Sequence, residues 1–314
     1  MNTTARSGLF GDLDVDVELD APIGAQTWFG IGGRADALIR PRNEAALVTL
    51  VERCNATQTP MRILGKGANL LVADDGVDGV VIRLDHEDFT RLRFNTDGEV
   101  NRVLAMAGAD LFKSVQELQR QGLAGFAQMT GIPGSIGGAV RMNAGGSHGC
   151  IGDCIQSVTC LDQTGQRLVY DRNQLDFDYR STNLPDHLIL SAVLELEPED
   201  PVRLRNQVKE IFAAKKASQP MADQSAGCVF RNPRIDGERI SAGKLIDETG
   251  CKGERIGGAQ VSMSHANFIT TGPDATASHV QALMQHVRDR VEHERGVVLE
   301  PEVVIWSRSE QGAS

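Results

Sequence analysis

Apolar residues recur at helical spacing in five segments of the chain, and polar capping residues lie next to several of them. This pattern is typical of helices that bury one face. Asn43 precedes the first of these segments and Asp274 begins the last, so each is the expected N-cap of its helix. Helices are expected at residues 44–54, 110–122, 198–216, 242–250 and 274–294.

Short aliphatic and β-branched runs, bounded by turn residues, predict strands between these helices. The mixture of strands and helices indicates an α+β fold class. The polar helix at 198–216 separates two halves of the chain, so a domain boundary is expected near residue 200. Strands are expected at residues 61–64, 79–84, 103–108, 157–162, 167–170, 187–196, 266–270 and 303–306.

The length of 314 residues allows two or three domains, each with its own core. Apolar residues make up 41% and charged residues 24%, which argues against a disordered chain. No apolar run approaches the roughly 20 residues of a membrane-spanning helix. The N-terminal segment is acidic, whereas a secretory signal would be basic and then apolar. We therefore expect a cytoplasmic protein that does not enter a membrane.

The formal net charge of −10 argues against sequence-independent binding of nucleic acid, which depends on neutralising phosphates. The six cysteines include no CxxC spacing, so neither a disulfide framework nor a zinc knuckle is indicated. Cys150 and Cys154 are spaced for one helix face, but no second pair of Cys or His follows them. No metal site is therefore expected.

The 33 glycines are clustered, and one cluster resembles a phosphate-binding loop. The segment GKGANLLV, which starts at Gly65, could expose successive N–H groups to an anion. It lacks the Walker A pattern, and Leu70 stands where the dinucleotide fingerprint has its third small residue. A tight turn between core elements is the alternative interpretation of this loop.

A second cluster, GIPGSIGGAVRMNAGG, starts at Gly131 and is more informative. Pro133 stiffens a turn, while Ser135 and Asn143 supply hydrogen bonds. Ordering so many glycines costs backbone entropy that packing or a ligand must offset. Two such loops together suggest a dinucleotide with its pyrophosphate between them.

Three polar residues are candidates for chemistry, and each has an ordinary alternative. Arg180 could bind a carboxylate through two hydrogen bonds, or it could be a surface arginine. Cys228 could be a buried structural cysteine. Glu302 lies between apolar residues at the start of a predicted strand, where it could be desolvated or could face solvent.

Seven segments together resemble the UDP-N-acetylenolpyruvoylglucosamine reductase (MurB) family in their order and rough spacing. The resemblance covers about residues 26–306, and its C-terminal motifs are not shared with other flavoproteins of the same flavin-binding fold. The segments are TWFGIGGRAD, ILGKGANLLVADDGVDGVVIRL, GIPGSIGGAVRMNAGG, DYRST, SAGCVFRNP, AGKLIDETGCKGERIGGAQVSMSHANFI and LEPEVVIW.

The resemblance implies an FAD-binding fold of the vanillyl-alcohol-oxidase type in two subdomains, followed by a C-terminal α+β substrate-binding domain. The expected bounds are 1–60 and 61–200 for the subdomains, 201–308 for the substrate-binding domain and 309–314 for a flexible tail. Between Arg180 and residue 201 the chain is too short for the tyrosine-bearing loop of one subclass. The chain therefore resembles the loop-less subclass.

The resemblance also implies the reaction. NADPH reduces noncovalently bound FAD, and UDP-N-acetylglucosamine enolpyruvate is then reduced to UDP-N-acetylmuramate, a step of peptidoglycan precursor synthesis. Arg180 and Glu302 match the residues that stabilise the enolate intermediate. Cys228 stands at the position of the proton donor, which is serine in many members, and a thiol is acidic enough to donate.

Further residues match binding positions of the family. Asn232, Lys244 and His265 match contacts to the UDP-sugar, whereas Arg231 and Thr271 stand where the family commonly has lysine and asparagine. The implied FAD contacts are Gly65, Lys66, Gly67, Ala68, Asn69, Leu70, Gly131, Ile132, Pro133, Gly134, Ser135, Gly137, Gly138, Asn143, Ala144 and Gly145.

Two rival classes of protein stay open. A flavin oxidase or dehydrogenase of the same fold would act on an alcohol, but the segments around Cys228, Lys244 and Glu302 favour the reductase. A flavin-binding module without turnover would need a missing catalytic residue, and only the cysteine in place of serine offers one. The glycine loops contain no family pattern for covalent flavin attachment. A monomer is expected because no interface helix is obvious.

Overall fold

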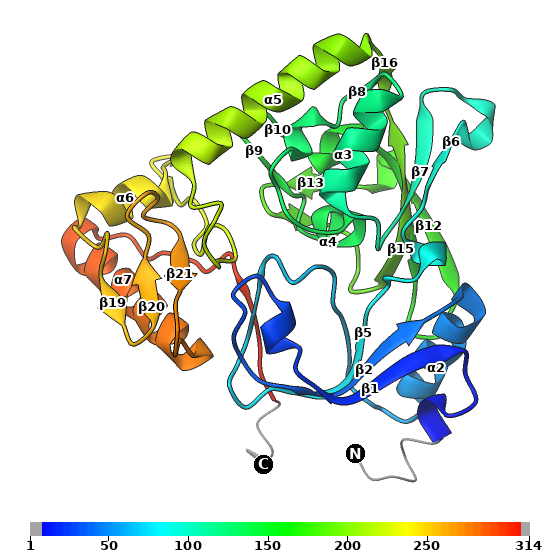
Figure 1. The fold of residues 1–314 in the computed structure, drawn as a ribbon, viewed down its shortest axis with the longest axis horizontal. Helices are drawn as coiled ribbons and strands as arrows, with labels where there is room; N and C mark the ends of the chain where they lie inside the picture. The colour runs from blue at the N-terminus through cyan, green and yellow to red at the C-terminus, as the bar shows by residue number, and fades with distance from the viewer. Residues whose placement is uncertain (1–7, 309–314) are drawn as a thin grey trace. The chain divides into compact units, whose positions relative to one another are not determined.

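The computed structural model describes residues 8–308, which pack into two compact units. The chain passes between the units several times, so each unit is discontinuous in sequence (Figure 1). The expected tail at 309–314 lies outside the described residues. The first unit contains residues 8–19, 37–66 and 79–215, and the second contains residues 20–36, 67–78 and 216–308.

A five-stranded antiparallel sheet forms the centre of the first unit. Its middle strand is buried along most of its length, as its run of aliphatic residues predicts. The strands expected at 103–108, 157–162, 167–170 and 187–196 are all confirmed within it. In spatial order the strands are β12 (Arg167–Asp171), β11 (Ile155–Leu161), β15 (Leu188–Glu195), β7 (Arg102–Met106) and β6 (Leu92–Phe94).

A four-stranded sheet includes the strands expected at 61–64 and 79–84. Helix α2 (Glu44–Ala56) connects two of its strands, and the Asn43 side chain accepts a hydrogen bond from Ala46 N at 2.9 Å, which confirms the predicted N-cap. The strands, in spatial order, are β1 (Val15–Ala21), β2 (Ala35–Pro41), β5 (Val77–Ile82) and β3 (Met61–Ile63).

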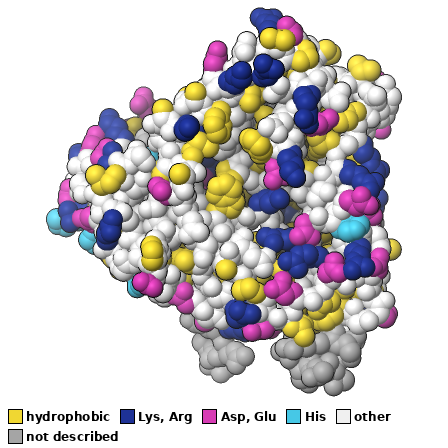
Figure 2. Space-filling view, viewed as in Figure 1, with side chains coloured by type: hydrophobic (Ala, Val, Ile, Leu, Met, Phe, Trp, Pro, Cys, Tyr) yellow, Lys and Arg dark blue, Asp and Glu magenta, His cyan; other side chains and the backbone are white. Residues whose placement is uncertain are grey.

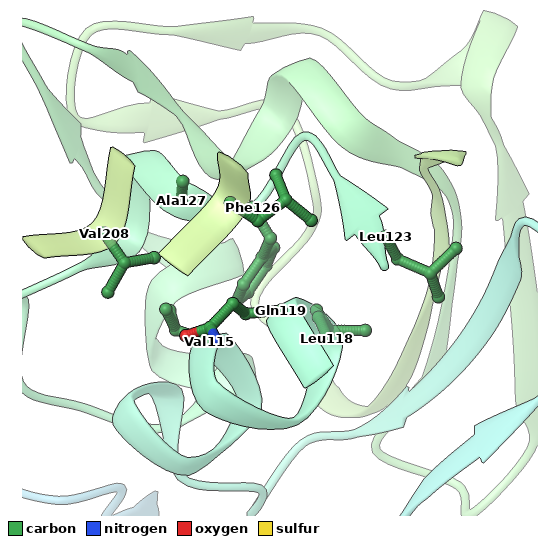
Figure 3. A pocket seen from close by; sticks show the side chains of 8 residues that line it. Val115, Leu118, Gln119, Leu123, Phe126, Ala127 and Val208 are labelled. Atoms are coloured by element: carbon green, nitrogen blue, oxygen red, sulfur yellow. The ribbon is translucent and has the colours of Figure 1, made fainter. Parts of the chain in front are cut away.

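Three more helices, α3 (Leu111–Arg120), α4 (Ile136–Arg141) and α5 (Pro201–Ser218), follow in the chain. Val115 and Leu118 of α3, with Val208 of α5, line a small apolar hollow (Figure 3). No titratable side chain lines this hollow, so it is a packing feature rather than a candidate for chemistry. Short strand pairs complete the first unit: β8 (Leu123–Ala124) with β16 (Glu197–Pro198), β9 (Gly145–Gly146) with β10 (Gly149–Cys150), and β13 (Phe177–Asp178) with β14 (Ser181–Thr182).

The second unit packs two helices and a small antiparallel sheet around its own core. The long helix α7 (Ala277–Arg295) buries Val280, Leu283 and Val287, as its spacing predicts. A parallel pair joins β4 (Leu70–Val72) to β22 (Val304–Trp306). The other elements are α6 (Ala242–Glu248), the sheet of β19 (Arg255–Ile256), β20 (Ala259–Val261) and β21 (Ile269–Thr271), and the hairpin of β17 (Arg234–Ile235) and β18 (Glu238–Arg239).

The prediction of Asp274 as the N-cap of the last helix is wrong. The N-cap is Thr276, whose Oγ1 accepts a hydrogen bond from His279 N at 3.2 Å. Asp274 adopts a left-handed φ of 60°, which belongs to the preceding turn and not to a helix start. The α+β fold class is confirmed, and no helix within residues 8–308 is long and apolar enough to span a membrane.

Candidate active site

The two predicted glycine-rich loops meet within the first unit at Gly65 and Ser135. A Cβ atom on Gly65 would lie only 2.7 Å from Ser135 Oγ, so this approach requires glycine. Ser135 is buried, and its Oγ accepts a hydrogen bond from Gly138 N at 3.4 Å. Lys66 forms an ion pair of 3.4 Å with Asp110, whose backbone bridges to Ser135. The structure therefore brings the two loops together.

The second loop has backbone conformations that favour glycine, and a buried polar group lies just before it. Gly131 and Gly134 have positive φ values of 72° and 149°, which side-chain-bearing residues rarely adopt. Thr130, just before the loop, has a buried hydroxyl without a hydrogen-bond partner among residues 8–308. A buried unsatisfied group beside a partly buried glycine-rich loop is where a bound molecule would supply the missing partner. The predicted loop residues Ile132, Pro133 and Ala144 are half-buried.

From Gly67 onward the first loop belongs to the second unit. Gly67 has a φ of 65°, and its carbonyl accepts a hydrogen bond from Trp28 N at 3.0 Å. Asn69 Nδ2 donates to the main-chain oxygen of Glu302 at 3.1 Å, while Asn69 O accepts from Val304 N at 3.1 Å. Ala68 is half-buried and Leu70 begins β4. Asn69 therefore joins the loop to the segment that carries Glu302.

Several predicted loop residues have packing partners of their own. Asn143 is buried, and its amide donates to Asp178 O at 2.8 Å and accepts from Gly152 N at 3.1 Å. A Cβ on Gly137 would lie 2.9 Å from Ala107 Cβ, and one on Gly145 would lie 2.4 Å from the Gly149 carbonyl oxygen. These contacts explain the residue types without a ligand, so FAD contacts at these positions stay predictions.

Arg180 lies in the two-residue turn between β13 and β14. Its φ of 55° is left-handed, which is uncommon for a residue other than glycine and is often found at functional sites. The Arg180 guanidinium carbon lies 5.2 Å from the ring centre of Tyr179. The turn is held in place because Asn143 bonds to its neighbour Asp178.

Lys215 is a charged residue near Arg180 that no motif in the sequence indicates. Its Nζ donates a hydrogen bond to Thr130 O at 2.6 Å and so ties α5 to the start of the second loop. Burial, and then the nearby charge of Arg180, lower the pKa of Lys215 to about 8. Lys215, Arg180 and the second loop therefore belong to one neighbourhood of the first unit.

Cys228 and Glu302 lie on adjacent extended segments of the second unit. Glu302 N donates a hydrogen bond at 2.8 Å to the main-chain oxygen of Val229, the residue after Cys228. Cys228 itself forms a β-bridge with Phe268. Glu302 is only 9% exposed, so the solvent-facing alternative is wrong for this carboxyl group. Cys228 is half-buried rather than enclosed. The structure thus brings two of the three predicted catalytic residues together.

The three predicted substrate contacts gather around the first turn of α6. Asn232 Oδ1 accepts a hydrogen bond from Ala242 N at 2.9 Å. His265 lies close enough to Gly243 that a Cβ there would be 3.2 Å from its Cε1. Lys244 is exposed and forms a 3.8 Å ion pair with Glu248. These side chains come from three separate segments, and helix α6 holds them together.

His265 is held in its neutral form with a defined tautomer. Burial lowers its pKa below the usual value. Asn267 N donates to His265 Nδ1 at 3.3 Å, so Nδ1 acts as the acceptor and the proton resides on Nε2. His265 can therefore donate one hydrogen bond through Nε2. Within residues 8–308, no three His, Cys, Asp or Glu side chains gather in a way that could hold a metal ion.

Two family models match the chain. The model of the UDP-N-acetylenolpyruvoylglucosamine reductase C-terminal domain matches residues 219–306, and that of an FAD binding domain matches residues 35–170. The reductase of Moorella thermoacetica is 36% identical over 98% of this chain and 99% of its own length. The reductase of Syntrophus aciditrophicus is 39% identical over 92% of this chain and 91% of its own length.

A solved structure gives the same result. The crystal structure of UDP-N-acetylenolpyruvylglucosamine reductase (MurB) from Thermus caldophilus is similar to this chain, with a TM-score of 0.77 and 34% identity. The similarity covers 93% of this chain and 98% of that one. The agreement spans both units rather than the FAD-binding segment alone.

Proposed function

The chain belongs to the UDP-N-acetylenolpyruvoylglucosamine reductase family, and from this we propose that it reduces UDP-N-acetylglucosamine enolpyruvate to UDP-N-acetylmuramate. It is an FAD-dependent oxidoreductase of peptidoglycan precursor synthesis that uses NADPH as hydride donor. The observation that carries the proposal is the pairing of the Cys228 and Glu302 segments inside the matched C-terminal domain. An alcohol-oxidising flavoenzyme would not require this domain.

The loops at 65–70 and 131–145 would hold FAD. They meet at Gly65 and Ser135, and the Thr130 hydroxyl is unsatisfied beside them. Bound FAD supplies the hydride transfer from NADPH to C3 of the enolpyruvyl group. FAD would be bound noncovalently, because the loops contain no family pattern for covalent flavin attachment.

Arg180 would bind the substrate carboxylate. Its guanidinium is always charged and can donate two parallel hydrogen bonds to a carboxylate. Addition of hydride at C3 places negative charge on the enolate of that carboxylate, so the interaction strengthens as the reaction proceeds. The left-handed turn fixes the backbone of Arg180, which limits the reorganisation required at that moment.

Glu302 and Cys228 would complete the addition. Glu302, in its protonated form, donates a hydrogen bond to the enolate oxygen. The Cys228 thiol then gives its proton to C2, so that one hydride and one proton have been added across the double bond. The resulting thiolate regains a proton from solvent, because Cys228 is only half-buried.

Asn232, Lys244 and His265 would hold the UDP-sugar. The exposed ammonium of Lys244 suits a diphosphate, and His265 Nε2 offers one neutral hydrogen-bond donor. Both tyrosines, Tyr170 and Tyr179, precede Arg180 in the sequence. No tyrosine is thus available between Arg180 and residue 201, which supports the loop-less subclass.

We also propose a cytoplasmic monomer that binds neither nucleic acid nor membranes. The net charge of −10 supports the proposal that the chain does not bind nucleic acid. On the face shown in Figure 2, Lys and Arg side chains are interspersed with Asp and Glu rather than gathered in one basic field. Light scattering of the purified chain measures the oligomeric state.

Two variants test the proposed function and roles. Glu302→Gln and Arg180→Ala should bind FAD and should be reduced by NADPH at a rate within about threefold of wild type. Reoxidation by the enolpyruvyl substrate should fall by at least about a hundredfold, because each group acts only on the developing enolate. Anaerobic stopped-flow absorbance at the flavin band measures both rates. Lys244→Met is the matched control, and it should raise KM with little effect on the maximal rate.

Equal loss of both half-reactions in the two variants would contradict the assigned roles. Failure of the wild-type protein to be reoxidised by the enolpyruvyl substrate would contradict the proposed function itself.

A further inference from the structure

Asn267 is a buried polar residue whose side chain pairs with the backbone of one other residue. Its side chain is 2% exposed. Asn267 Oδ1 accepts a hydrogen bond from Phe230 N at 3.0 Å, and Asn267 Nδ2 donates to Phe230 O at 2.8 Å. The amide thus satisfies both main-chain groups of Phe230, as a neighbouring strand would do.

The main chain of Asn267 extends this pairing in both directions. Asn267 O accepts a hydrogen bond from Val229 N at 2.9 Å, and the next residue, Phe268, forms the β-bridge with Cys228. Asn267 N donates to His265 Nδ1 at 3.3 Å. One residue therefore contacts both the segment of Cys228 and the ring of His265.

The same segment is held on its other side by Glu302. Val229 O accepts a hydrogen bond from Glu302 N at 2.8 Å, and Phe230 bridges to Pro301. The segment at 228–230 is thus clamped between the Asn267 amide and the backbone at 301–302. Loss of the side-chain amide would leave the Glu302 side of the clamp intact and weaken the other side, where the main-chain bond from Val229 N to Asn267 O and the Cys228–Phe268 bridge would remain.

We propose that Asn267 is a positioning residue for proton transfer, which acts through the backbone of Val229 and Phe230 to hold Cys228 in place beside the Glu302 segment. The inference rests on the proposed function, because it concerns the protonation of the substrate at C2. Asn267 acts through these backbone bonds and not by touching the reacting atoms. Its contribution is confined to the step that uses Cys228.

Asn267→Asp is the most direct test. The shape is kept, but a carboxylate oxygen replaces Nδ2 and faces the carbonyl oxygen of Phe230, where it cannot donate. NADPH should reduce the flavin of this variant at a rate within about twofold of wild type, because the hydrogen bonds of Asn267 run to Val229, Phe230 and His265 and not to the cofactor loops. Reoxidation by the enolpyruvyl substrate should slow by at least about tenfold.

Thr249→Val is the matched control. Thr249 is also buried in the second unit, and its hydroxyl donates to Ile246 O at 3.0 Å, but it makes no bond to the segment at 228–230. The control should lower the melting temperature without slowing reoxidation. A comparable slowing in Thr249→Val would show that loss of any buried hydrogen bond has this effect, and the inference would fail.

A double-mutant cycle with Cys228→Ala distinguishes the positioning of Cys228 by Asn267 from a general disturbance of the folded structure. If Asn267 acts through Cys228, adding Asn267→Asp to Cys228→Ala should slow reoxidation by less than about twofold further. Full additivity of the two effects would overturn the inference. Asn267→Ser removes Nδ2 without adding charge. Like Asn267→Asp, it should slow reoxidation by the substrate and leave flavin reduction by NADPH nearly unchanged.

The remaining outcomes also test the role of Asn267. If neither Asn267 variant folds with flavin bound, Asn267 is a structural residue and the inference is wrong. If the variants match wild type in reoxidation, the inference is equally wrong while the proposed function stands. If the wild-type protein itself is not reoxidised by the substrate, it is the proposed function that fails.

Discussion

Arg180 and Asn143 show how the residue scale combines function with packing. Asn143 has a left-handed φ of 40°, and its buried amide fixes the turn on which Arg180 lies. The sequence marks both residues as important, and the family resemblance implies a cofactor contact for Asn143, which stays a prediction; its packing partners were not predictable because they are backbone groups, one of them 35 residues away. Asn267 and Lys215 were missed for the same reason: their hydrogen-bond partners are backbone groups 37 and 85 residues away.

Lys215 should make the stability of the first unit depend on pH. Its pKa of about 8 in the folded chain lies below the ordinary value, so the unfolded chain binds more protons between about pH 8 and 10.5. The penalty for holding the charged form is fully present below pH 8 and is relieved as the pH rises. The unfolding free energy of wild type minus that of Lys215→Met should therefore increase by about 1 to 3 kcal/mol from pH 7.5 to 10.

Urea unfolding at the two pH values measures this difference, and Lys216→Met is the matched control at an exposed neighbour. A Lys215→Met difference that is unchanged between the two pH values would show that the folded chain does not depress this pKa.

At the scale of elements, the start of α2 was predictable and that of α7 was not. Asn43 caps α2 from the adjacent position, so the sequence pattern sufficed. The α7 start has its own N-cap, Thr276, and Asp74 also accepts hydrogen bonds there, from Ala277 N at 2.8 Å and Ser278 N at 2.9 Å, across more than 200 residues. No local pattern can reveal an acceptor that comes from so far away. The segment at 228–231 was likewise unassigned, because its pairing partners at 267–268 and 300–302 are remote.

Asp74→Ala should destabilise the second unit by about 1 to 2 kcal/mol, because α7 would lose the carboxylate that satisfies two of its first N–H groups. Burial raises the pKa of Asp74, but hydrogen bonds from Ser278 and from Ala277 N outweigh this and hold it below the usual value. The stabilisation is thus present at neutral pH and is lost as the pH falls through that lowered pKa.

Denaturant unfolding at pH 7 compares Asp74→Ala with Asp75→Ala, an exposed neighbour. Equal stabilities of the two variants would argue that Asp74 does not cap α7.

At the scale of the whole molecule, the α+β class and the family were predictable, whereas the discontinuous units were not. Residues 67–78 belong to the second unit because β4 pairs in parallel with β22, more than 200 residues later. Hydrophobic periodicity carries no information on such pairing. The order of the motifs identified the family, because the glycine loops, Cys228 and Glu302 each had an ordinary alternative interpretation when taken alone. The domain bounds at 60 and 200, and the individual site roles, stay predictions.

In the proposed function, this chain passes electrons from NADPH through a bound flavin to an enolpyruvyl sugar nucleotide. The most direct measurement is an anaerobic visible spectrum of the purified protein, first with one equivalent of NADPH and then with UDP-N-acetylglucosamine enolpyruvate. NADPH should bleach the flavin bands, and they should return fully when the substrate is added. A flavin that bleaches but returns only with oxygen, or a protein that binds no flavin at all, would contradict the proposed function.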